Sequence, residues 1–398
     1  MWGDHSGTRK LVIFKLGELF CGAGGLALGA LQAKVHANGT DYRIASVWAN
    51  DYDEDACETY RNNICKDQPD VVVHKNVNDL NMDKLVSIDG LAFGFPCNDF
   101  SALGEKKGMN GTYGPLYSYG IKALKHFQPK WFLAENVSGL RHANEGKDLK
   151  VILEAMYEAG YDIYPHLYRF EEYGVPQARH RIIVVGLRED LNLDFKIPAT
   201  TVTQSITCRE AIENPPIPED APNQELTAQD ETVVARLKHI KPGQNAFTAD
   251  IPPELQLKII GAKISQIYKR LDPDKPSYTI TGSGGGGTHV YHWKENRALT
   301  NRERARLQSF PDTFVFHGSK ESVRRQVGMA VPPVAAKVFF EAILKTFAGV
   351  QYQSVQPSIT PTIHMKGTLE SFSRDRQSSD NPRPGNPKQL TSLTPGVE

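Results

Sequence analysis

The sequence contains little cysteine and no long apolar run. Only five of its 398 residues are cysteine, and no two of them form a CxxC pair. This spacing argues against a zinc site and a disulfide framework, so we expect no metal and reduced thiols in a cytoplasmic protein. Because no signal peptide is recognisable and no apolar stretch is long enough to span a bilayer, we also expect no membrane partner.

Net charge is absent as well. The 46 Lys and Arg residues balance 46 Asp and Glu residues, so no overall field draws the chain toward a charged partner. A local basic patch is sufficient for binding DNA, and the charge balance therefore leaves this partner open. The hydrophobic fraction of 40% predicts a large core and two domains.

The N-terminal part contains a strand, a glycine-rich turn and a helix in succession. The strand is predicted for residues 11–20 and the helix for residues 26–31, with Cys21-Gly22-Ala23-Gly24-Gly25 between them. This is the first unit of a nucleotide-binding α/β fold. Taken alone the turn is a weak signal, because many tight strand-to-helix turns bind nothing.

The next strand, predicted for residues 44–49, strengthens this interpretation. Asp51 follows it, at about the distance from the glycine turn where an acidic residue accepts hydrogen bonds from ribose hydroxyls. Tyr52 beside it could face an adenine. The alternative is that Asp51 only caps the N-terminus of a helix over residues 54–62.

The chain is organised around Gly94-Phe95-Pro96-Cys97-Asn98-Asp99-Phe100-Ser101. An apolar strand over residues 89–93 precedes this stretch, and a glycine-rich loop over residues 102–114 follows it. Cys97 thus stands at the end of a strand ahead of a loop able to close, which makes it a candidate nucleophile. The alternative is a buried structural cysteine, since free Cys is among the most buried residue types.

Further polar groups stand next to later strands. Glu135 follows the strand 130–134, and because parallel strands present their carboxyl ends at one sheet edge, we expect it at the same edge as Cys97. Arg179 and Arg181 alternate ahead of an apolar strand, so one strand face could present both guanidinium groups. The alternative for both is an ordinary surface arginine.

The α/β pattern stops near Leu191, where we place a domain boundary. Residues 191–276 are rich in proline. A short strand over residues 278–281 then leads into the glycine run 282–287. Such a run lets a backbone approach a ligand closely, or serves as a slack linker.

The C-terminal part begins with a locally basic segment. Across residues 297–325 Lys and Arg outnumber Asp and Glu, which suits contact with phosphates, and Thr300 with Glu303 fits a capping box that opens a helix. Another helix is predicted for residues 334–347. Residues 350–398 are rich in Ser, Thr, Pro and Gln and are expected to be disordered.

Together these segments resemble, in order, the motifs of the cytosine-5 DNA methyltransferases. The matching segments are Phe20-Cys21-Gly22-Ala23-Gly24-Gly25, Pro96-Cys97 with Phe100-Ser101, Glu135-Asn136-Val137, Gln177-x-Arg179-x-Arg181, the run from Arg297 to Pro311, and Gln326-Val327-Gly328 with Val331-Pro332. The resemblance covers roughly residues 11–345, and six ordered motifs make coincidence negligible.

The resemblance implies an α/β fold: a Rossmann-like, S-adenosylmethionine-dependent methyltransferase domain with a smaller, irregular target-recognition domain. The catalytic domain would span residues 11–190, completed by 321–349. The target-recognition domain would span 191–296, and a hinge contacting the DNA backbone 297–320. The implied cofactor is S-adenosylmethionine, with S-adenosylhomocysteine as product. Its expected binding residues are Phe20, Gly22, Gly24, Gly25, Asp51, Tyr52, Asn76, Pro96, Leu116 and Ala330.

The resemblance also implies a mechanism. The Cys97 thiolate adds to C6 of a cytosine flipped out of the duplex, so that C5 can attack the methyl group. Glu135, when protonated, hydrogen-bonds N3 and the exocyclic amine. Arg179 or Arg181 binds O2, with Arg181 preferred. The residues expected to bind DNA are Ser101, Gln177, Thr279, Ile280, Gly284, Gly285, Arg302 and Arg304.

Three residues depart from the family pattern. Asn98 stands where many members carry Gln, and Asn76 stands where a cofactor-facing Asp is common. Met329 stands where the last motif usually has an Asn near the methionine end of the cofactor. These departures put the adenine contact and the cofactor affinity in question.

The implied function is methylation of a specific cytosine in double-stranded DNA by a prokaryotic monomer associated with the nucleoid. The enzyme would act in a restriction-modification system, without binding the cognate endonuclease, or as an orphan methylase. One competing interpretation is an RNA cytosine methyltransferase. The other is a non-catalytic DNA-binding or cofactor-sensing protein, against which the intact Cys97, Glu135 and Arg181 argue.

Overall fold

A computed structural model describes residues 10–95, 116–257, 265–282 and 286–360. These residues belong to one unit, Met1–Pro361. Several predicted site residues lie outside the described ranges, and their assignments stay predictions: Pro96, Cys97, Ser101, Gly284 and Gly285.

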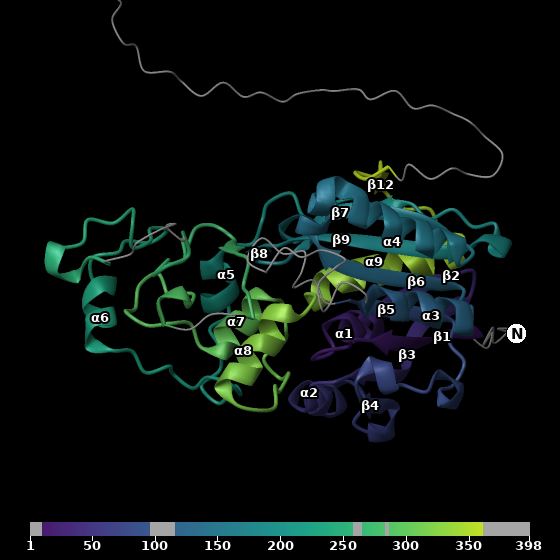
Figure 1. Ribbon diagram of the computed structural model, residues 1–398, viewed down its shortest axis with the longest axis horizontal. Coiled ribbons are helices and arrows are strands. Elements are labelled where there is room, and N and C mark those ends of the chain that lie inside the picture. The colour runs from purple at the N-terminus through teal and green to yellow at the C-terminus, as the bar shows by residue number, and fades with distance from the viewer. Residues whose placement is uncertain (1–9, 96–115, 258–264, 283–285, 361–398) are drawn as a thin grey trace, which may run out of the picture. The chain divides into compact units, whose positions relative to one another are not determined.

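The centre of the fold is an eight-stranded, mostly parallel sheet (Figure 1). Its strands are β1 (Lys10–Leu19), β2 (Lys34–Ala37), β3 (Thr40–Asp51), β4 (Val72–His74), β5 (Gly90–Gly94), β6 (Trp131–Val137), β7 (Tyr161–Arg169) and β9 (His180–Arg188). The order is β2-β3-β1-β5-β6-β9-β7, with β4 paired to β3. Only the pairs β2–β3, β6–β9 and β9–β7 are antiparallel. This arrangement confirms the predicted Rossmann-like α/β fold.

The carboxyl ends of the parallel strands meet at one edge of the sheet. Leu19 of β1 is paired with Asn50 of β3 and with Phe93 of β5, and Gly94 is paired with Glu135 of β6. The middle of β5 is fully buried, as expected for an apolar strand covered on both faces. The segments that follow these strands are therefore brought together in space.

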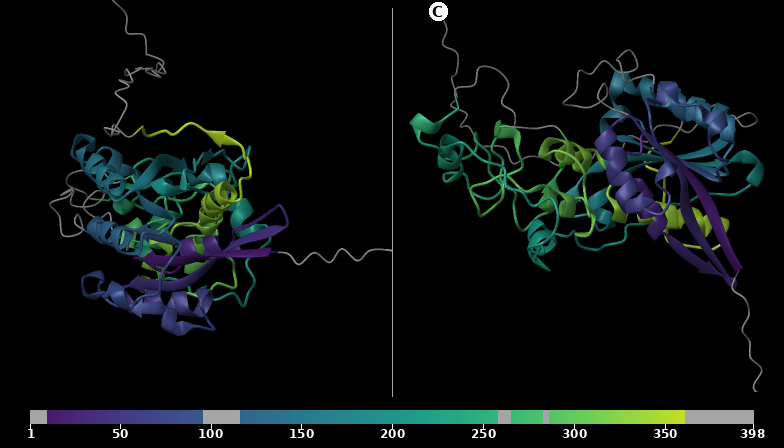
Figure 2. Two further views of the ribbon diagram at one scale, coloured as in Figure 1. Left: turned by 90° about the vertical axis from the view of Figure 1, so that its right-hand side faces the viewer. Right: turned by 90° about the horizontal axis from the view of Figure 1, so that it is seen from below.

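Helices cover both faces of this sheet (Figure 2), and those predicted for residues 26–31, 54–62 and 334–347 are present. Those of the first part of the chain are α1 (Gly25–Gln32), α2 (Glu54–Ile64), α3 (Tyr117–Phe127) and α4 (Lys147–Glu158). Those of the last part are α8 (Lys320–Met329) and α9 (Pro333–Phe347).

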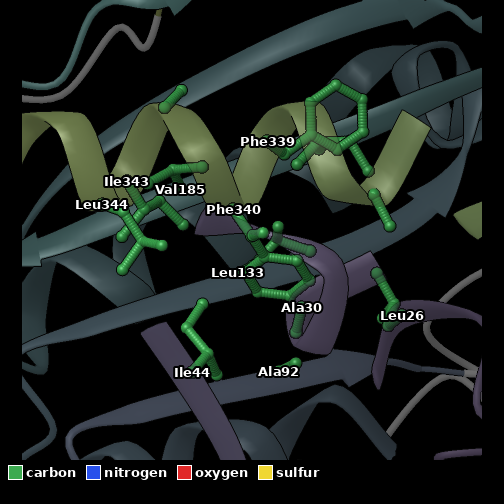
Figure 3. Close-up of a cluster of buried hydrophobic side chains, with 14 of the residues drawn as sticks. Leu26, Ala30, Ile44, Ala92, Leu133, Val185, Phe339, Phe340, Ile343 and Leu344 are labelled. Atoms are coloured by element: carbon green, nitrogen blue, oxygen red, sulfur yellow. The ribbon is translucent and has the colours of Figure 1, made fainter. Parts of the chain in front are cut away.

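Helix α9 completes the core although it comes from the far end of the described chain. Its Phe340, Ile343 and Leu344 pack against α1 and the central strands (Figure 3). A Cβ atom on Gly25 would collide with the carbonyl of Val331, and one on Gly29 with Ala336, so the close approach of α1 and the C-terminal segment depends on these glycines. This packing supports the predicted completion of the catalytic domain by C-terminal residues.

The region between β9 and α8 consists of short elements, as its proline content suggests. They are β10 (Ile197–Pro198), α5 (Cys208–Glu213), α6 (Glu231–Leu237), β11 (Ser277–Tyr278) and α7 (Asn301–Leu307). Two apolar clusters hold it together, one around Leu271 and Trp293 and the other around Leu237 and Tyr291. Strand β11 pairs with β8 (Gln177–Ala178), which ties this region to the catalytic sheet.

The boundary predicted at Leu191 lies too early in the chain. Phe195 and Ile197 are almost completely buried in the same core as α9, and the N–H of Thr201 donates to the carbonyl of Glu172. The catalytic core therefore extends beyond β9 to the start of the proline-rich region.

The start of the predicted disordered tail is instead part of the fold. Strand β12 (Ser354–Val355) pairs with β10, and the hydroxyl of Tyr352 donates to the carbonyl of Lys196 at 2.8 Å. Ser358 accepts a hydrogen bond from the N–H of Leu167. The predicted disorder is thus wrong for residues 350–360. The residues that hold this segment lie far from it in the sequence, so its local composition does not reveal them. Residues 361–398 lie outside the described ranges.

The stretch Lys320–Phe347 is long and apolar enough, by composition alone, to cross a membrane. In the fold it is divided into α8 and α9 by the segment that contains Pro332, and 67% of its most apolar part is buried. Its hydropathy is therefore explained by the packing of α9 in the core.

Candidate active site

A pocket opens where the parallel strands end, around the glycine-rich turn after β1. Gly24 has a left-handed backbone (φ 87°), a conformation that favours glycine, and precedes α1. The carboxylate of Asp51 accepts hydrogen bonds from the N–H groups of Gly22 at 2.8 Å and Asp53 at 3.0 Å. The pocket beside this turn has a volume of about 920 Å³, counted to its open mouth. Its lining by a glycine turn and by the acidic residue at the end of β3 suits a ligand of the nucleoside class.

Most residues predicted to bind the cofactor surround this pocket. Those that line it are Phe20, Gly22, Gly25, Asp51, Tyr52 and Ala330. Gly24 instead faces Tyr60 and Ile64, Asn76 is exposed and caps a short turn at Val77–Asp79, and Leu116 precedes α3. Cofactor contacts of Gly24, Asn76 and Leu116 receive no support from this geometry and stay predictions.

Asp51 supports the glycine turn and does not cap α2. The N-cap of α2 is Asp53, whose side chain accepts from the N–H of Ala56 at 3.0 Å, so the alternative interpretation of Asp51 is wrong. Burial raises the pKa of the Asp51 carboxyl. Its oxygens accept hydrogen bonds from the backbone of the turn and of the residues that follow Asp51, and a carboxylate has enough lone pairs to accept from a ligand as well.

Glu18 is a pocket residue that the sequence analysis missed. It lies near the end of β1, is 1% exposed, and accepts a hydrogen bond from the hydroxyl of Tyr60 at 3.2 Å. Burial raises the pKa of Glu18 to about 8, against the effect of the Tyr60 hydrogen bond and together with that of nearby Asp51. A charged residue inside an apolar strand just before a glycine turn was the available signal.

Arg325 of α8 also lines the pocket and was not assigned to it from the sequence, whereas Met329 lines it at the position that the last motif implies. Among the lining residues that the structure describes, Arg325 alone has a cationic side chain. It is half exposed, with its guanidinium 3.9 Å from the carboxylate of Asp53. It shares the pocket with four carboxyl groups, those of Glu18, Asp51, Asp53 and Glu135.

At the same edge of the sheet, β6 and β9 present Glu135 and Arg181 to each other. Arg181 Nε lies 2.9 Å from Glu135 Oε1, and the two side chains are only 12% and 13% exposed. The amide of Asn136 donates to the carbonyl of Phe95 at 3.1 Å, which fixes the last described residue before Pro96-Cys97. The predicted pair is thus assembled where the chain enters the Cys97 segment.

Gln177 and Arg179 connect the catalytic sheet to the second region. Gln177 Oε1 accepts from the N–H of Ile280 at 2.8 Å, and its Nε2 donates to the carbonyl of Leu307 at 3.1 Å. Arg179 donates to the carbonyl of Ile280 at 3.0 Å. Both side chains are buried. This corrects two predictions. Gln177 is not placed to touch DNA. Arg179 does not share a strand face with Arg181, because Arg179 lies between β8 and β9 and belongs to neither strand.

Thr279 and Ile280 belong to the same connection. The hydroxyl of Thr279 donates to the carbonyl of Ala178 at 2.8 Å, and the side chain of Ile280 is fully buried in an apolar cluster. The predicted contact of the Ile280 side chain with DNA is therefore wrong. A DNA contact by the half-buried Thr279 stays a prediction.

Arg302 and Arg304 on α7 are buried, whereas the sequence analysis placed them at the surface. The guanidinium of Arg302 donates to the carbonyls of Pro222 and Pro311, both at 2.9 Å, and to that of Phe314. Its donors bind backbone groups, so its predicted role as a phosphate contact is wrong. Arg304 is 3% exposed and lies against a cavity on another side of α7.

The chain belongs to the C-5 cytosine-specific DNA methylases, whose family model matches residues 14–345. It is thus a DNA (cytosine-5-)-methyltransferase, and the motifs identified in the sequence are those of this family. Like other members, it belongs to the S-adenosylmethionine-dependent methyltransferases.

Individual relatives agree. The chain is 54% identical to Type II methyltransferase M.BbvI of Brevibacillus brevis over 373 residues, covering 91% of this chain and 97% of the relative. It is 40% identical to Type II methyltransferase M.NgoFVII of Neisseria gonorrhoeae, covering 84% and 87%. A protein encoded within an Escherichia coli prophage, assigned as a DNA modification methyltransferase, has a TM-score of 0.64 at 23% identity, covering 84% and 99%. This last likeness shows the fold alone.

Proposed function

We propose that the enzyme modifies a specific cytosine in double-stranded DNA through a covalent adduct of Cys97, as the methyltransferase of a Type II restriction-modification system. The observation that carries this proposal is the Glu135–Arg181 pair, whose Glu135 lines the pocket beside the glycine turn, where β5 leads into Pro96-Cys97. The names of the relatives support the Type II assignment.

The pocket fits S-adenosylmethionine. Asp51 has lone pairs free for ribose hydroxyls, and the exposed ring of Tyr52 offers a surface for adenine. Arg325 supplies the positive charge that the carboxylate of the amino-acid part requires. When bound, the cofactor supplies an electrophilic methyl group on a sulfonium.

The chain's own residues then perform the steps at the base. The Cys97 thiolate attacks C6, and the electron pair displaced toward C5 makes this carbon nucleophilic. Glu135 holds N3 and the exocyclic amine, and Arg181 fixes Glu135 and reaches O2. After methyl transfer, loss of the C5 proton and release of the thiol restore the aromatic ring.

Access to C6 requires that the base leave the duplex. The irregular region from about residue 203 to 296 is the part of the chain available to hold the DNA and read its major groove. We infer that the enzyme acts as a monomer in the cytoplasm of a prokaryotic cell, and that a cognate endonuclease would recognise the same site without binding it.

The test is mechanism-based trapping. Duplex DNA containing 5-fluorocytosine should form a denaturation-resistant adduct with the wild type, because fluorine cannot leave C5 as a cation. Cys97→Ser should form none, whereas Cys65→Ser, at a half-buried cysteine, should trap normally. Glu135→Gln should trap about 100-fold more slowly or worse, since an amide cannot donate a proton to N3 as an acid does. Methylation of transfer RNA in place of duplex DNA, or trapping by Cys97→Ser, would overturn the proposal.

A further inference from the structure

Arg304 lies at the base of a narrow cavity between α7 and α8. The cavity measures about 270 Å³ when the open solvent at its mouth is included, and its enclosed part has room for about one water-sized group. It is separate from the methyl-transfer pocket, with which it has no lining residue in common. Its lining residues are Glu225, Thr227, His289, Leu299, Asn301, Arg304, Lys320, Glu321 and Arg324.

The guanidinium of Arg304 has no hydrogen-bond or ion-pair partner among the residues that the structure describes, although it is 3% exposed. Its neighbours on the same helix differ. Arg302 is satisfied by three backbone carbonyls, and Arg306 forms a hydrogen-bonded pair with Asp312 at 2.8 Å. An unpartnered buried cation is costly, so a counter-ion in the cavity would stabilise this one.

The other groups around the cavity are also mostly donors. Arg324 Nε and His289 Nδ1 are buried without a partner in the described part of the chain, and Lys320 lies at the mouth, where α8 begins. Glu225 and Glu321 are exposed at the mouth, and neither forms an ion pair with Arg304 or Arg324 within the described residues. Burial and the proximity of Arg324 lower the pKa of Arg304 to about 10, so it remains charged at neutral pH.

We propose that this Arg304 cavity binds one anion of the phosphate type. A phosphate oxygen is about the size of a water molecule and fits a narrow cavity, and a guanidinium with several free N–H donors is the side chain best suited to it. The N-terminus of α8, a helix of ten residues, adds its positive end to the charge of Arg324 and Lys320.

Two sources can supply this anion: a phosphodiester of the bound DNA or a free phosphate ion. The first rests on the proposed function, because it requires that the DNA lie across α7 and α8. The second does not, so a binding test with inorganic phosphate examines the cavity even if the DNA assignment fails.

The first experiment measures thermal unfolding with increasing inorganic phosphate, against sodium chloride at equal ionic strength. Phosphate should raise the midpoint of the wild type by several degrees and leave Arg304→Met unchanged. Arg209→Met, at a half-exposed arginine outside the cavity, serves as the matched control and should respond like the wild type. Equal phosphate responses of wild type and Arg304→Met would overturn the proposal.

The second experiment identifies the source. If the anion is a DNA phosphate, Arg304→Met should reduce the slope of log affinity against log salt by about 1, which is about a fourfold smaller loss of affinity between 50 and 200 mM salt. A neutral methylphosphonate at one backbone position should then weaken the wild type but not the variant. An unchanged salt slope together with a lost phosphate response would assign the cavity to a free ion.

A carboxylate of the chain itself is the remaining competitor. If Glu321 turned inward to pair with Arg304, the Glu321→Gln variant would respond to phosphate little more than the wild type does. It would also be destabilised as much as Arg304→Met is. The proposal expects Glu321→Gln to bind phosphate at least as tightly as the wild type, because a negative charge leaves the mouth. Destabilisation of both variants without any phosphate response would reject the anion site.

Discussion

Glu18 and Asp51 place two buried carboxyl groups in a pocket proposed to hold a sulfonium cation. Their neighbourhood is unfavourable for ionisation in the absence of a ligand, because burial raises both pKa values. With a pKa of about 8, Glu18 is mostly protonated at neutral pH. Binding of a cation favours the ionised form, and a proton must then be released.

This linkage predicts a pH dependence of cofactor affinity. S-adenosylmethionine should bind more tightly as the pH rises toward about 8 and level off above it, by at most about tenfold per pH unit. S-adenosylhomocysteine, whose thioether is neutral, should show a weaker dependence. Glu18→Gln should remove the difference between the two ligands, as measured by isothermal titration calorimetry in buffers of different protonation enthalpy. An identical slope in wild type and variant would contradict the assignment.

Arg325 faces a different part of the same ligand. Replacing it with Gln should weaken S-adenosylmethionine by about 10- to 100-fold, the effect of losing a charged hydrogen bond. Methylthioadenosine lacks the amino-acid part and should bind the wild type and Arg325→Gln equally. Lys337→Gln, at a half-exposed lysine of α9 that does not line the pocket, is the control. Equal losses for both ligands would mean that Arg325 only supports the shape of the pocket.

At the scale of elements, the pairing of β8 with β11 is reinforced by two buried side chains. Gln177 and Arg179 together hold both backbone groups of Ile280. Gln177 also donates to the carbonyl of Leu307 in α7. The two side chains therefore fix both Ile280 and the end of α7 relative to the catalytic sheet. The glycine run after Ile280 starts from this fixed point. Its first residue, Gly282, lies directly against α8, because a Cβ atom on Gly328 would collide with it.

Removing one of these side chains should loosen the connection without touching the cofactor pocket. Gln177→Leu leaves the buried N–H of Ile280 without an acceptor, at a cost of about 1–3 kcal/mol. Hydrogen exchange at Ile280 should accelerate, and methylation of DNA should fall while cofactor affinity is kept. Gln351→Leu, at an exposed glutamine, should change none of these quantities. Unchanged exchange at Ile280 would show that strand pairing alone is sufficient.

The strands and their polar ends follow from the sequence because apolar runs and glycine turns are local signals. The place of Glu135 at the end of β6 could be expected for this reason, whereas its meeting with Arg181 was implied only by the family motifs, because it depends on β9 running antiparallel to β6. The burial of Arg302 and Arg304 could not, because a count of charges does not say which way a side chain on α7 points. The carbonyls that bind Arg302 come from two separate segments, at Pro222 and at the turn from Pro311 to Phe314, and such partners are visible only in the folded chain.

At the scale of the whole described molecule, α7 packs into both parts at once. Its Ala305 belongs to an apolar cluster with Phe310 and Val327, while Leu307 belongs to the cluster of the second region around Leu271. The order of the chain suggested a hinge here. The packing makes α7 an element shared by both parts, and the hinge stays a prediction.

Exchange of the second region tests where its boundary lies. A chimera that replaces residues 203–296 with those of a relative should be stable and methylate a new target. One that replaces residues 191–296 also exchanges Phe195 and Ile197 in the catalytic core, and should lose about 1–3 kcal/mol of unfolding free energy through poor repacking. Urea unfolding and bisulfite sequencing measure the two outcomes. Equal stability of the two chimeras would mean that the domain boundary lies at Leu191 after all. A chimera that methylates the original target would mean that specificity lies outside residues 203–296.

The way Ile280 is held has a consequence for how new specificities arise. Gln177 and Arg179 bind its peptide groups, which every residue except proline possesses in full, and the side chain needs only to be apolar enough for its cluster. A foreign recognition segment can therefore join the same catalytic body without matching changes in that body. Recombination between relatives could exchange this segment. The product would keep the catalytic residues and methylate a new target, so a single exchange would be sufficient to change the DNA sequence that the enzyme recognises.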